Sequence, residues 1–92
     1  MGATAQEEQG LEGLALYDKI IAVTVNFLGL VSEKFVTRLI RTTLHKTPDQ
    51  LVRQDIVKLE EGIRVAISLL TEDEKTVEEF SRQFLLIAKQ DL

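Results

Sequence analysis

Residues 20–32 read IIAVTVNFLGLVS, the longest stretch of the chain without a charged side chain. Taken alone, its β-branched residues favour a strand. However, no turn residue interrupts positions 14–28, which is too long for an ordinary strand, and no second strand is predicted to pair with it. The stretch therefore predicts a helix over residues 11–29.

This first helix is apolar around most of its circumference. One stripe at helical spacing consists of Leu14, Tyr17, Ile21, Val25 and Leu28. A second stripe consists of Leu16, Ile20, Val23, Phe27 and Leu30. A helix of this kind must be covered nearly all round, either by lying at the centre of its own domain or by contacting a partner. We expect the second stripe to be the interface of a homodimer, which is the commonest assembly.

Gly29 follows the helix directly, with no polar loop before the next apolar residues. We expect it to adopt a left-handed cap conformation or to let two backbones approach closely. A second helix is predicted over residues 31–46, ending before the Thr47-Pro48 break. Its expected inward residues are Val31, Phe35, Leu39 and Leu44.

Three start signals follow in the second half of the chain. Thr47, Pro48 and Gln50 suit the N-cap, N1 and N3 positions of a short helical turn over residues 48–53. Asp55 is the expected N-cap of a helix over residues 56–70, whose inward residues are Ile56, Leu59, Ile63, Ala66, Ile67 and Leu70. Thr71 and Glu74 form a T-x-x-E capping box for a helix over residues 72–89, whose inward residues are Val77, Phe80, Phe84 and Ile87.

These elements predict an all-α fold, a four-helix bundle-like single domain with a short extra helical turn between helices two and three. We expect residues 1–10 to be a disordered lead-in and residues 11–92 to form the helical domain. A chain of 92 residues is one domain. Because its core is small, self-association is an available source of further stability.

The charge of the chain is unevenly distributed. The net charge is −4, yet residues 34–53 hold five basic residues and one acid. A row at helical spacing forms a basic face, which consists of Lys34, Arg38, Arg41 and His45. This basic face could be solvated beside the acidic last helix, bind an acidic protein, or bind anions or nucleic acid. It has no aromatic residue for base stacking, so nucleic acid is the least favoured of these.

No catalytic, metal or cofactor site is predicted. The chain has no cysteine, and its single histidine, His45, cannot build a metal site with nitrogen or sulfur ligands. Acidic residues cluster at Glu60-Glu61, Glu72-Asp73-Glu74 and Glu78-Glu79. We expect these clusters to be solvated helix faces and caps, so the chain is expected not to be an enzyme.

The segment from Phe27 to Ser32, followed by Phe35, Val36 and Arg38, resembles a small helical domain found at the C-termini of some bacterial signalling proteins, including serine/threonine kinases. Gly29 matches the glycine of that family, Val31 the aliphatic residue after it, and Ser32 the small residue. Leu30 stands where the family tends to have proline. The resemblance covers about residues 20–88 and implies an accessory role in bacterial signalling, without a catalytic residue.

The location expected from the sequence is the cytoplasm. The first ten residues lack the basic and apolar regions of a signal peptide. The uncharged run of residues 20–32 is shorter than the roughly 20 residues of a membrane-spanning helix, so we expect no membrane partner. The function that the sequence favours is protein association, and the alternative is anion or nucleic-acid binding by the basic face.

Overall fold

The computed structural model describes residues 2–90, and it describes side chains from residue 11 to residue 90. The helices are α1 (Gly2–Leu28), α2 (Ser32–Leu39), α3 (Arg53–Leu70) and α4 (Glu74–Leu86). Short 3-10 turns lie at η1 (Gly29–Val31), η3 (Pro48–Gln50) and η4 (Ile87–Lys89), and a π-helical turn lies at η2 (Ile40–Leu44). No residue from 2 to 90 is in a strand, so the all-α prediction is confirmed.

The run from Leu11 to Leu44 is continuous helix, 34 residues long, because α1, η1, α2 and η2 follow one another without a loop. Gly29 bends this run, with φ of +68°, and no atom lies within 4 Å of the place where a Cβ would stand. The left-handed conformation, one of the two predicted roles of Gly29, is therefore confirmed, and the other, a close approach of two backbones, does not occur there. Together with α3 and α4, residues 2–90 form three helical segments and the 3-10 turn at η3.

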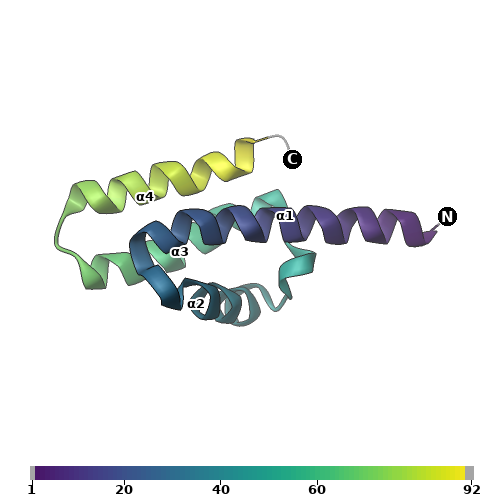
Figure 1. Ribbon diagram of the computed structural model, residues 1–92, viewed down its shortest axis with the longest axis horizontal. Coiled ribbons are helices and arrows are strands. Elements are labelled where there is room, and N and C mark those ends of the chain that lie inside the picture. The colour runs from purple at the N-terminus through teal and green to yellow at the C-terminus, as the bar shows by residue number, and fades with distance from the viewer. Residues whose placement is uncertain (1, 91–92) are drawn as a thin grey trace.

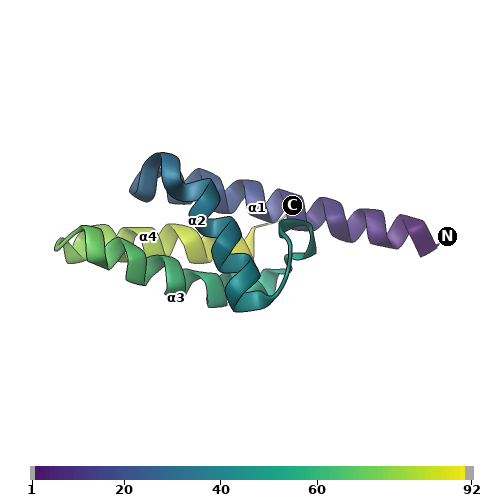
Figure 2. The same ribbon diagram turned by 90° about the horizontal axis from the view of Figure 1, so that it is seen from below.

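α1, α3 and α4 run roughly along the long axis of the molecule, whereas α2 crosses this direction steeply (Figures 1 and 2). α1 and α4 lie side by side along the long axis, and α2 turns back at the bend to lie against α3. The end of the described chain returns to α1, where the Lys19 ammonium donates to the Gln90 side chain at 2.9 Å. The α1–α2 corner and the α3–α4 turn lie at the same end of the molecule, away from the N-terminus.

The core contains residues from every segment. Its fully buried members are Leu16, Ile20, Val36, Ile40, Leu51, Ile56, Leu59, Ile63, Ile67, Phe80, Phe84 and Ile87. Phe80 contacts Phe27 of α1 edge to face, with 5.3 Å between the ring centres. It also contacts Phe84 in a tilted arrangement, with 5.1 Å between the ring centres. This aromatic cluster joins α4 to the stretch around residue 27, whose β-branched residues are helical as predicted.

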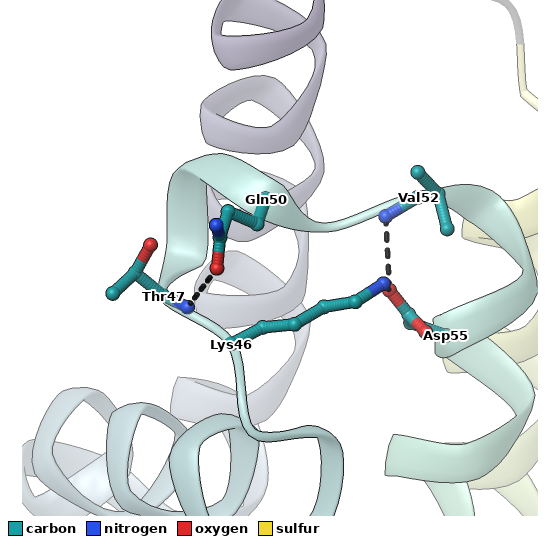
Figure 3. Close-up of polar contacts among 5 residues, drawn as sticks. All are labelled: Lys46, Thr47, Gln50, Val52 and Asp55. Carbon is teal, nitrogen blue, oxygen red and sulfur yellow. Dashed lines mark hydrogen bonds and ion pairs between the residues drawn. The ribbon is translucent and has the colours of Figure 1, made fainter.

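Two of the predicted helix starts are shifted. The helix expected over 56–70 begins at Arg53, and Asp55 is its third residue, whose carboxylate accepts the Val52 N–H at 3.1 Å (Figure 3). The helix expected over 72–89 begins at Glu74, and its N-cap is Asp73, which accepts the Lys75 N–H at 3.0 Å. Thr71 instead ends α3 in extended conformation, so naming it the N-cap was wrong.

The helical turn predicted over residues 48–53 forms over the shorter stretch Pro48–Gln50. The Gln50 side chain accepts the Thr47 N–H at 3.0 Å, which closes the start of η3 (Figure 3). α1 is helical from Gly2, whereas the sequence placed its start at residue 11. The division of the chain into a lead-in over 1–10 and a domain over 11–92 stays a prediction.

The inward faces of the later helices differ from the prediction at their ends. The four residues expected inward at the end of the chain are covered: Phe80 and Phe84 of α4 and Ile87 of η4 are buried, and Val77 is half-buried against the core. In α3, the expected Leu70 is the last residue of the helix and is 72% exposed. In the second half of the long run, Ser32 and Val36 of α2 and Ile40 of η2 are buried. Of the four residues expected inward there, Phe35, Leu39 and Leu44 are half-buried against the core, whereas Val31 is 60% exposed at the corner.

Candidate functional site

The predicted interface stripe does not lie together on the surface. Leu16 and Ile20 are fully buried in the core of the chain itself, and Val23 and Phe27 are half-buried against that core. Only Leu30, which is 100% exposed, is free for a partner. The area argument for a dimer through this stripe therefore fails, because the chain covers four of the five side chains itself.

The first stripe of α1 is divided, because Tyr17, Ile21 and Leu28 are half-buried against the core while Leu14 and Val25 are exposed. Leu11, Leu14 and Val25 are 68%, 47% and 43% exposed, and Asp18 and Ala22 are exposed between them. These five positions, at spacings of three and four residues, form one line along the helix, which we term the α1 outer face. Only Leu14 and Val25 of this face belong to a predicted stripe, so the sequence alone did not define the line.

A second set of exposed apolar residues lies at the end of the molecule that holds the two turns. Leu30 and Val31 form the α1–α2 corner, and Leu69 and Leu70, 83% and 72% exposed, end α3. The α3–α4 turn continues into Glu72, so its apolar residues adjoin negative charge. The corner instead continues into the basic face.

All four residues of the predicted basic face are exposed. Lys34, Arg38 and Arg41 line one depression along α2 and η2 together with Glu33 and Thr37. None of the three forms an ion pair with any side chain that the structure describes. His45 follows the π-helical turn with φ of +56°, a left-handed conformation that ends the helical run.

The basic residue next along the chain behaves differently. Lys46 forms an ion pair with Asp55 at 2.8 Å, and Asp55 is only 3% exposed (Figure 3). The same oxygen, Oδ2, also accepts the Val52 N–H, so two donors converge on it. This pair fixes the connection between η2 and α3, and no sequence signal pointed to it, because the partners are nine positions apart in an irregular segment.

The prediction that the Glu60-Glu61 cluster is solvated is wrong for Glu60. Glu60 is 8% exposed rather than solvated. Its carboxylate accepts the Ser81 hydroxyl at 3.0 Å and pairs with Arg64 at 3.0 Å, so it links α3 to α4. Among the side chains of residues 11–90, no three potential metal ligands gather in one place.

The helical run Leu11–Leu44 is long and apolar enough to cross a membrane by length and composition, and only 17% of its most apolar stretch is buried inside the molecule. The core helix of a soluble protein and a signal sequence pass the same test. The length and composition of this run are therefore those of a membrane span, of a core helix and of a signal sequence alike.

No protein-family model, no curated protein and no solved structure matches the chain. The candidate functional surfaces of the chain are the α1 outer face, the α1–α2 corner and the basic face.

Proposed function

We propose that the chain is a non-enzymatic protein-association module that pairs with a second copy of itself through the α1 outer face. The observation that carries this proposal is the exposure of Leu11, Leu14 and Val25 along one line of the longest helix. Aligned exposed apolar residues of this kind are typical of interfaces. The proposed architecture is four-helix bundle-like, with the two halves of the long run as separate helices.

The α1 outer face also suits a symmetric contact. Two copies of one helix can pack along the same line, so a two-fold dimer would bury both faces together. Asp18 lies in the middle of the line, where its carboxylate would lose water on association. Such a buried, unpaired charge weakens an interface, so Asp18 sets a limit on the affinity.

The test compares matched substitutions at micromolar concentration, with mass measured by light scattering after gel filtration. Val25→Lys, at a 43% exposed site on α1, should convert the dimer to the monomer. Val65→Lys, at a 55% exposed site on α3, makes the same change away from the face and should leave the mass unchanged. Asp18→Asn should lower the dissociation constant. A concentration-independent monomer for the unmodified chain rejects the proposal.

The proposed setting is an accessory role in bacterial signalling, in the cytoplasm, as the resemblance around Gly29 implies. Identification of a signalling protein that co-purifies with the chain from cells, and that is lost with Val25→Lys, would support it. A second candidate function is anion or nucleic-acid binding by the basic face, favoured by the unpaired state of Lys34, Arg38 and Arg41 among the described side chains.

A further inference from the structure

The α1–α2 corner exposes two aliphatic side chains to solvent. Leu30 is completely exposed and Val31 is 60% exposed, directly after the left-handed Gly29. The left-handed conformation of Gly29 turns the chain, and the two residues follow it in the 3-10 turn η1 with their side chains exposed. Leu30 is not among the residues that pack against the core.

The same side of α2 carries three of the basic residues. Ser32, Val36 and Ile40 are buried, and they define the inward side of the helix. Lys34 and Arg38 each lie two positions from Val36 in the sequence. Two positions correspond to about 200° around a helix of 3.6 residues per turn, so both residues are on the side opposite Val36. Leu30 precedes Lys34 by four positions and Arg41 follows Arg38 by three, so they lie near the same outward line.

The outer face of α2 therefore combines an apolar tip with a row of three cations, and Glu33 is the acidic residue that lines the same depression. We propose that this face docks on an anionic lipid bilayer. Leu30 and Val31 enter the boundary between headgroups and acyl chains, while Lys34, Arg38 and Arg41 contact lipid phosphates and carboxylates.

Charge complementarity favours this occupant. A bilayer surface offers apolar depth and negative charge side by side, which matches the tip and the row. Nucleic acid would use the row but not the two aliphatic residues, and the row has no aromatic residue on which a base could stack. The expectation of no membrane partner rested on the absence of a span, and a helix that lies on the surface needs none.

The test measures co-flotation of the full chain with vesicles of phosphatidylcholine alone and of phosphatidylcholine mixed with phosphatidylserine. We expect binding to the mixed vesicles that falls with added salt, since surface charges are screened. The triple variant Lys34→Gln, Arg38→Gln, Arg41→Gln should bind about a hundredfold more weakly, since each basic residue near such a surface strengthens binding roughly fivefold.

Leu30→Gln is the test of the tip and Leu69→Gln is its matched control. Both leucines are strongly exposed, but Leu69 adjoins the acidic turn. Leu30→Gln should weaken binding about tenfold, whereas Leu69→Gln should leave it unchanged. Unchanged far-UV circular dichroism shows that the variants remain folded.

Three results overturn the proposal. The first is equal or absent binding to the two kinds of vesicle, and the second is an equal loss for Leu30→Gln and Leu69→Gln. The third is salt-insensitive association that resists alkaline extraction, which indicates insertion of the long apolar run instead. If the chain ignores vesicles but binds duplex or single-stranded nucleic acid through the three cations, the nucleic-acid function replaces this one. Dimerisation is measured separately, without lipid, so each proposal can fail alone.

Discussion

Gly13 of α1 lies directly against the backbone carbonyl of Asp49 in η3, so that a Cβ on Gly13 would overlap the Asp49 carbonyl group. The glycine is buried. It shares one side of α1 with Leu16 and Ile20, at spacings of three and four residues. This contact therefore holds the 3-10 turn against α1 and fixes which side of the helix faces the core.

Gly13→Ala should destabilise the protein by about 2 kcal/mol or more, because a backbone atom cannot rotate away from the added methyl group. Gly62→Ala is the matched control, since its Cβ would lie 2.9 Å from the end of the flexible Leu39 side chain. There, the gain of about 1 kcal/mol in helix propensity offsets most of the crowding. Urea unfolding measures both, and equal losses would contradict the role given to the Asp49 carbonyl.

Gly29→Val should destabilise the protein by about 1 kcal/mol or more, because a β-branched residue strongly disfavours positive φ. Crowding contributes nothing here, since the site of the Cβ is open. Gly29→Asn should cost less, because asparagine tolerates the left-handed region. Thermal unfolding in which the valine and asparagine variants match would show that the chain does not bend through this conformation.

Thr24→Val should stabilise the protein by about 1 kcal/mol. Thr24 is fully buried on α1, and its hydroxyl has no hydrogen-bond partner within the part of the chain that the structure describes. Valine keeps the shape and removes the cost of an unsatisfied buried polar group. Chemical unfolding checks this, and a loss of stability would mean that the hydroxyl has a partner.

Asp55→Ala should destabilise the protein by about 3 kcal/mol, because it removes the acceptor of the Val52 N–H and the partner of Lys46 together. Asp55→Asn keeps an oxygen for the Val52 N–H but loses the charge, so it should cost less than the alanine variant. Lys46→Met added to the asparagine variant should cost little more. Urea unfolding of the three variants separates the ion pair from the cap, and equal losses for alanine and asparagine assign the effect to charge alone.

The fold class could be predicted because it depends on local patterns. Helical spacing of Ile56, Leu59 and Ile63, and of Phe80 and Phe84, places each residue inward whatever the helix packs against. Gly29 was predicted to be left-handed for a similar reason, since only the local chain is involved. The 3-10 turn at Thr47–Gln50 likewise follows from the side chains of the turn itself.

The tertiary structure decided which side of α1 is covered. Leu14 and Leu16 belong to two apolar stripes, and contacts such as those of Gly13 with Asp49 and of Phe27 with Phe80 turn Leu16 inward and leave Leu14 outside. It also buried Asp55 and Glu60, whose partners come from other segments. Hydrophobic periodicity therefore determined that these segments are helices, whereas the rotation of α1 and the surfaces left for partners depend on contacts between residues far apart in the chain.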